Sequence, residues 1–330
     1  MSVSEQPARL AVHSVDDLVG LVPYLLGFHP EESLVVLVLE RGCVAVTARM
    51  DLPPPECAHG LDRVLTRLFG RFPTAEGWFL AFTDDDRLAW EVLATCVEVV
   101  GIARLGRLIQ VGATHWTADR PGGVSHVHGG GASTAAAEAT LLGLPARRSR
   151  SDLAASIAGP PDTEVEALLA EFDLRAPEVD GLGARGRRRL LRRLLRTPGH
   201  LGVADCVRAV LLVRRGEAQV AALRGLCRAN AEQQLELWTR VARHSLLQDR
   251  PTVLGLLAMA AWQTGDGALQ VVCLEEIDRL DPDLPLGALL ELLNAEVVPP
   301  YEWDGLRESL LAGLAEALRG VDQPVHRPDR

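Results

Sequence analysis

An aliphatic run followed by a turn predicts a strand hairpin near the start of the chain. Residues 34–39 are all Leu or Val, which is typical of a strand covered on both faces. Arg41-Gly42 can turn the chain, so that residues 43–50 return as a second strand. Counting back from this turn places Leu34 opposite Arg49 and Glu32 opposite Asp51.

Helical and strand patterns alternate around this hairpin. Ser14 with Asp17 three positions on predicts a helix start, and Gly27 predicts its end, with a kink or restart at Pro23. Further helices are predicted near residues 56–71 and 87–100, and further strands near residues 78–83 and 107–112. We therefore predict a mixed α/β layer domain over residues 1–145.

From Ser151 onward the pattern is helical, punctuated by Pro and Gly. We predict an α-helical domain over residues 146–320 and a flexible tail at 321–330. Residues 258–290 resemble one tetratricopeptide-like helical hairpin, although simple antiparallel helix packing would give the same pattern. One such unit cannot bury its own apolar face, so it must stack on neighbouring helices. The predicted fold class is thus α/β plus all-α, with a partly tetratricopeptide-like second domain.

Composition narrows the classes of function. The chain has 330 residues and a net charge of −10, and its basic residues are all arginine. Mechanisms that need a lysine amine, such as Schiff-base chemistry and ordinary phosphate-loop ATP hydrolysis, are excluded. The six cysteines are far apart without a CxxC pair, so we expect reduced thiols, no structural metal and no cofactor. Without a signal peptide or a spanning apolar stretch, a cytoplasmic location is expected.

Polar residues next to the aliphatic run form one candidate site. His29, Glu32 and Ser33 precede the first strand, and Arg49 and Asp51 end the second. These five residues are a candidate ligand site that could bind a polar small molecule or perform acid–base chemistry. The alternative is architectural: Arg49 bridges the two carboxylates, His29 caps the preceding helix, and Pro30 sets the turn.

Arginines and leucines alternate at helical spacing over residues 185–196, which predicts a strongly cationic amphipathic helix. Such a helix could meet nucleic acid, an anionic membrane surface or an acidic partner. Alternatively, its leucines face the core, and its arginines are solvated or paired with carboxylates of the same chain. The candidate anion or partner surface comprises Arg187, Arg188, Arg192, Arg193 and Arg196. We expect a protein partner rather than a membrane or nucleic acid, because the chain is acidic and the helix lacks aromatic residues for base stacking.

Two further motifs are weaker. His126 and His128 would share one side of a strand and could bind a metal with His115 or Asp119, but the adjoining glycines also fit an exposed loop. Residues 181–186 match a dinucleotide fingerprint, yet no strand pattern precedes them.

Three segments carry a resemblance to a known family. VPYLLGFHPEESLVVLVL, the following TARMDLP, and AAWQTGDGALQVVCLEEIDRLDPDLPLGALLELL resemble the actinobacterial domain-of-unknown-function family 4192 over roughly the whole chain. The resemblance implies the same two-part architecture but no activity. We therefore expect a noncatalytic binding or regulatory protein, the alternative being an enzyme acting on a polar small molecule at the His29/Glu32/Ser33/Arg49/Asp51 cluster.

Overall fold

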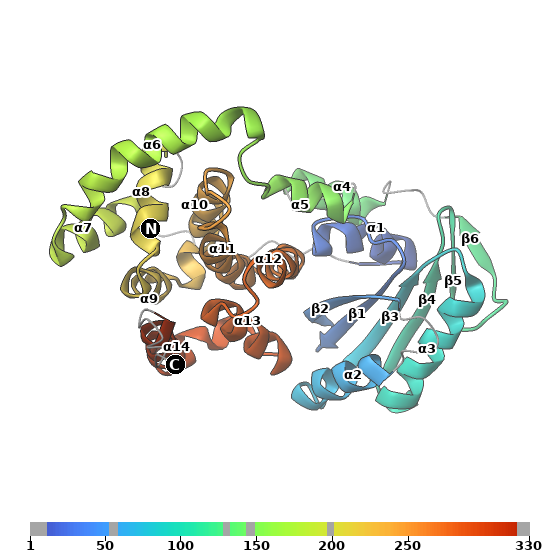
Figure 1. Cartoon of the computed structure of the whole chain (residues 1–330). Helices are drawn as coiled ribbons and strands as arrows, with labels where there is room; N and C mark the ends of the chain where they lie inside the picture. The colour runs from blue at the N-terminus through green and yellow to red at the C-terminus, as the bar shows by residue number, and fades with distance from the viewer. Residues whose placement is uncertain (1–11, 53–58, 128–132, 143–148, 197–200, 322–330) are drawn as a thin grey trace, which may run out of the picture. The chain divides into compact units, whose positions relative to one another are not determined.

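A computed structural model describes residues 12–52, 59–127, 133–142, 149–196 and 201–321. The chain divides into two compact units, Met1–Leu153 and Ala154–Arg330 (Figure 1). The first is an α/β unit and the second is helical, as predicted. The tail predicted to be flexible lies, from residue 322, outside the described residues.

The α/β unit is built on a six-stranded mixed sheet with the strand order β2-β1-β3-β4-β5-β6. The strands are β1 (Ser33–Glu40), β2 (Cys43–Asp51), β3 (Glu76–Phe82), β4 (Leu105–Val111), β5 (His115–Ala118) and β6 (Ser125–Val127). The β3–β4 pair is parallel, because α3 crosses over between these strands, and the other described pairs are antiparallel. The two short strands β5 and β6 were not predicted.

The helices of this unit are α1 (Val15–Leu26), α2 (His59–Arg71), α3 (Asp86–Val100) and α4 (Thr134–Leu141); α5 (Arg150–Ser156) spans the division. In α1, the Ser14 hydroxyl accepts the backbone N–H of Asp17 at 3.0 Å, and Gly27 ends the helix with a φ of 78°. The helix runs through Pro23 without ending. Residues 34–38 of β1 are fully buried, so both faces of this strand are covered, as its unbroken aliphatic run predicts.

The hairpin of β1 and β2 corrects the predicted register. Arg41 and Gly42 both have positive φ, as a two-residue turn of type I′ requires, and Glu40 pairs with Cys43 as predicted. A β-bulge then shifts the pairing between Val38 and Leu39. As a result Arg49 lies opposite Val35 instead of Leu34, and Asp51 opposite Ser33 instead of Glu32, so the predicted register is wrong by one residue.

The helical unit contains α6 (Asp162–Asp180), α7 (Ala184–Leu195), α8 (Val203–Val213), α9 (Gly216–Gly225), α10 (Ala231–Arg243), α11 (Arg250–Thr264), α12 (Gly267–Leu280), α13 (Pro285–Ala295) and α14 (Trp303–Val321). Helix α11 is its centre, because every residue from 253 to 263 is buried and the helix contacts α10, α12 and α13. A Cβ on Gly255 would lie 2.7 Å from the Leu286 side chain, so the approach of α13 requires glycine there. None of the described helices combines the length and apolar character that crossing a membrane requires.

The helical hairpin predicted over residues 258–290 corresponds to α11, α12 and the start of α13. Gly265 ends α11 with a φ of 85°, and the Asp266 side chain accepts the backbone N–H of Leu269 at 2.9 Å to begin α12. The antiparallel hairpin is therefore present, and its tetratricopeptide-like character stays a prediction.

Candidate functional site

The cluster at the polar end of β1 is held together by Arg49. Its Nε donates to the Ser33 hydroxyl at 2.9 Å, and its Nη2 lies 2.5 Å from an Asp51 carboxylate oxygen. The Ser33 hydroxyl in turn donates to the Glu31 carbonyl. The guanidinium carbon also lies 5.9 Å from the centre of the Phe28 ring. The Arg49 side chain is only 16% exposed, so its guanidinium interacts mainly with groups of the protein and little with solvent.

Glu32 turns away from Arg49 toward the end of β3. Its φ of 42° lies in the left-handed region, which is uncommon for a residue with a side chain. The Thr83 hydroxyl lies 2.9 Å from both carboxylate oxygens of Glu32, and the buried Gln110 side chain donates to the Thr83 carbonyl. The interpretation in which Arg49 bridges both carboxylates is therefore wrong, because the bulge sets Arg49 beside Ser33 and the backbone of Glu32 points its side chain elsewhere.

The structure thus brings together three of the five predicted residues, Ser33, Arg49 and Asp51, whereas Glu32 joins Thr83. His29 is exposed and makes no hydrogen bond or ion pair with the described residues, so helix α1 is capped by Gly27 and not by this imidazole. Sequence reasoning missed Thr83 and Gln110. Their only sequence signal is a polar residue near or just beyond the end of a mostly apolar strand.

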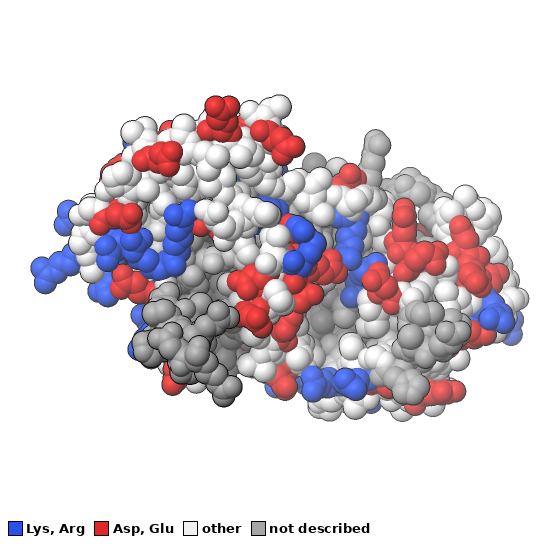
Figure 2. Space-filling view, viewed as in Figure 1, with Lys and Arg blue, Asp and Glu red and all other residues white. Residues whose placement is uncertain are grey.

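Six exposed arginines, five on α7 and Arg196 at its C-cap, form the second candidate site, which we call the arginine face. They line a hollow of about 650 Å³, and Figure 2 shows their charge as blue atoms gathered at the left of the view, where Figure 1 places α7. On the opposite side, Leu191 and Leu194 are buried and α7 contacts α8 and α9. The members of the arginine face are Arg185, Arg188, Arg189, Arg192, Arg193 and Arg196.

Arg187, which the sequence placed on this surface, does not line the hollow. Its guanidinium donates to the Leu182 carbonyl at 2.5 Å and lies 3.7 Å from a Glu217 carboxylate oxygen. Arg185 and Arg189, which were absent from the predicted surface, line it instead. The leucine stripe was predicted correctly, since the two leucines at its centre are buried.

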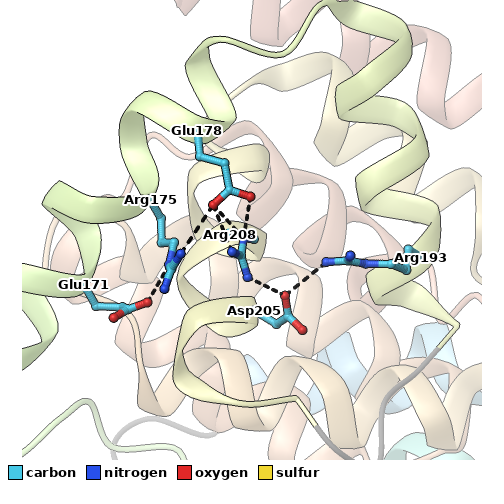
Figure 3. A network of polar contacts seen from close by, with 6 residues as sticks. All are labelled: Glu171, Arg175, Glu178, Arg193, Asp205 and Arg208. Atoms are coloured by element: carbon cyan, nitrogen blue, oxygen red, sulfur yellow. Dashed lines mark hydrogen bonds and ion pairs between the residues drawn. The ribbon is translucent and has the colours of Figure 1, made fainter.

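One edge of the arginine face is tied to an ion-pair network (Figure 3). The Arg193 guanidinium lies 3.2 Å from Asp205, and Arg208 bridges Asp205 and Glu178 at 2.9 Å each. Hydrogen bonds from Arg208 lower the pKa of Glu178 below its ordinary value. The network continues through Arg175 to Glu171. The side chains of the other five members of the arginine face make no hydrogen bond or ion pair with any residue that the structure describes.

The sequence matches the family described as "Domain of unknown function (DUF4192)" over residues 16–301. The chain belongs to this family. The matched range includes both the polar end of β1 and all of α7, so both candidate sites lie within the DUF4192 region. Searches of curated proteins and of solved structures found no match.

The DUF4192 region also contains a cavity of about 760 Å³ in the helical unit, bounded by the α5–α6 connection, the α10–α11 connection and α12. The buried Arg250 lies at its floor and donates to the Ile157 carbonyl at 2.7 Å, and more weakly to the Ala242 carbonyl and Glu276 at 3.4 Å each. Hydrogen bonds from Arg279 lower the pKa of Glu276. Arg250 therefore fastens three chain segments together, and no pattern in the sequence indicates this role.

The remaining motifs do not converge on a site. His126 stacks on Trp116 with ring centres 4.3 Å apart, and His128 lies outside the described residues. No group of three His, Cys, Asp or Glu side chains in the described part of the chain is arranged to hold a metal. Residues 181–186 join α6 to α7, so no strand precedes the glycines and the dinucleotide motif lacks its required setting, as predicted.

Proposed function

We propose that this member of the DUF4192 family is a cytoplasmic, noncatalytic binding or regulatory protein whose helical unit receives an anionic partner on the arginine face. The observation that supports this proposal is the hollow lined by six exposed arginines, five of which have no partner among the described residues. Guanidinium groups in this arrangement attract carboxylates, phosphates or sulfates.

Folding stability does not explain these arginines. Neighbours on the arginine face are three or four residues apart, a spacing at which like charges on a helix repel. The helix also begins without an acidic residue or a side-chain cap, and Arg185 lies in its first turn, where the helix dipole disfavours a cation. The arrangement weakens α7 in isolation, and an anionic partner would relieve that repulsion.

Elsewhere in the same unit, most of the described arginines pair with carboxylates. Arg214 lies 2.6 Å from the buried carboxylate of Asp249, and Arg215 lies 2.6 Å from Asp180. Further arginines paired with carboxylates are Arg175, Arg208, Arg224, Arg250, Arg279 and Arg307. A helix that leaves five arginines unpaired therefore departs from the pattern of its own unit.

The polar end of β1 supports the noncatalytic part of the proposal. Ser33, Arg49 and Glu32 are each held by neighbouring protein groups, so they act as a joint between strands. Buried thiols are poor nucleophiles, since burial raises the pKa of Cys96 to about 12 and that of Cys206 to about 11. The free thiols of the described cysteines fit a reducing compartment.

Retention on a heparin column tests the proposed surface with a sulfated polyanion. We expect Arg188→Gln/Arg192→Gln to elute at clearly lower salt than the unmodified protein. The matched control, Arg228→Gln/Arg319→Gln, removes the same charge from two exposed arginines outside the arginine face and should elute later than the test variant. Equal losses in both variants, or no retention of the unmodified protein, would overturn the proposal.

A further inference from the structure

The shape of the arginine face limits what it can bind. At about 100° per residue, its six side chains cover a sector of roughly 140° on α7. Their positions extend over about 17 Å along the helix axis, or three turns. The leucines occupy the opposite sector. The surface is therefore a short, narrow stripe of guanidinium groups without apolar residues between them.

A lipid bilayer fits this stripe poorly. Amphipathic helices that bind membranes insert their apolar face between the lipid headgroups. In α7 that face is already used, because Leu191 and Leu194 are buried and the helix contacts α8 and α9. Only the charged side is free, and it offers no apolar side chain for insertion.

Nucleic acid also fits poorly. No aromatic residue occurs in α7, so bases have no ring on which to stack. Carboxylates border the stripe: Asp205 pairs with Arg193, and Glu217 lines a small surface pocket together with Arg188. A phosphodiester chain longer than the stripe would meet these carboxylates.

Nor does the chain supply its own occupant from the segments outside the described residues. Those segments contain few carboxylates: Glu5, Glu56, Asp322 and Asp329. No two of the four lie within six positions of one another, so none of the segments can present a row of anions to three helical turns. These segments therefore supply no occupant for the arginine face.

Given the proposed function, on which this step rests, we infer that the partner is an acidic protein segment with several Asp or Glu side chains within about 17 Å. The planar guanidinium fork matches a carboxylate with two parallel hydrogen bonds. A short peptide can place its carboxylates along the stripe and end before the bordering acidic residues. A short acidic helix can do both: its carboxylates have the same spacing as the arginines of α7, and it can end before the bordering acidic residues.

Fluorescence anisotropy at ~150 mM salt, where weak long-range attraction is screened, tests this partner class. The probe is a labelled glutamate-rich helical peptide of about 12 residues, which matches the stripe in length. A peptide with glutamine in place of every glutamate is the neutral control. Oligothymidylate of similar length and phosphatidylserine vesicles represent the two other classes.

We expect the acidic peptide to bind more tightly than the other three probes. Arg188→Gln/Arg192→Gln should weaken its binding roughly tenfold, because two charge-assisted contacts are lost. Arg228→Gln/Arg319→Gln should change it less than about twofold. Circular dichroism of both variants verifies that the helices are intact.

The outcomes separate the inference from the proposed function. Oligothymidylate or vesicles could bind more tightly than the acidic peptide and lose that binding in Arg188→Gln/Arg192→Gln. This result would contradict the inference of an acidic protein partner, but it would still support an anion-binding surface. Binding of the glutamine peptide as tight as that of the glutamate peptide would overturn the role of carboxylates. Failure of every probe to bind, together with failure to be retained on heparin, would overturn the proposed function itself.

Discussion

Removing charge from the arginine face should stabilise the protein. In Arg188→Gln/Arg192→Gln, four like-charged neighbour pairs disappear: Arg188 with Arg185 and Arg192, and Arg192 with Arg189 and Arg196. Each such pair costs about 0.2–0.5 kcal/mol on an exposed helix, so about 1–2 kcal/mol of repulsion is removed. Against this, Arg192 lies in the last turn, where a cation gains about 0.3–1 kcal/mol from the helix dipole. The net gain should lie between about 0 and 1.7 kcal/mol, since glutamine and arginine have similar helix propensities.

Urea unfolding followed by far-ultraviolet circular dichroism measures this change. The midpoint should rise with an unchanged slope, and the rise should shrink at high salt, because salt screens the repulsion that the variant removes. Arg193→Gln is the matched contrast, since it breaks the pair with Asp205 and should not raise the midpoint. A double variant less stable than the unmodified protein would show that these arginines support the fold, and the argument for a binding role would lose its basis.

Three other predictions concern groups within the protein. Arg250→Met should lower the free energy of unfolding by about 2–4 kcal/mol, because two backbone carbonyls and a carboxylate lose their hydrogen-bond donor. Urea titration measures this change, and a loss under about 1 kcal/mol would contradict the role of Arg250 in holding three segments together. Arg49→Ala should cost about 1–3 kcal/mol, whereas the exposed His29→Ala should leave the melting temperature nearly unchanged; the opposite order would contradict a joint built on Arg49. Glu178→Gln should destabilise the protein at neutral pH, because the ionised carboxylate of Glu178 pairs with Arg208 in the folded state. The difference should begin to shrink as pH falls through the ordinary carboxyl value of 4.5, and it should disappear only below the lowered pKa of folded Glu178, where the carboxyl is protonated in both states. Melting curves of both proteins across this pH range measure it, and a difference that persists in acid would contradict the ion-pair explanation.

Local sequence signals were sufficient for much of the fold. Residues 34–39 gave a strand buried on both faces because a long aliphatic run leaves no polar side for solvent. Arg41-Gly42 located the hairpin turn because few residues accept two consecutive positive φ angles. The buried side of α7 followed from the spacing of its leucines. Each of these features depends on residues that are close together in the chain.

The features that were missed depend on contacts between distant residues. The bulge in β2 changes the partner of Arg49, and no residue of the strand marks its position in advance. Glu217, the carboxylate that Arg187 approaches, lies on another helix. Arg250 is the first residue of α11. Only the folded chain shows that its guanidinium reaches the Ile157 carbonyl, 93 residues away. Strands β5 and β6 are too short to leave a recognisable alternation.

The all-guanidinium composition of the arginine face has a consequence for how its attachment could be controlled. An arginine side chain stays protonated throughout the physiological pH range, so acidification or alkalinisation within a cell does not alter the charge of this surface. Acetylation of lysine, which neutralises many basic surfaces, has no target there, because all six side chains are arginine. A change of charge that controls this interaction would therefore have to occur on the acidic partner. Phosphorylation of serine or threonine beside its carboxylates would add negative charge and tighten the complex.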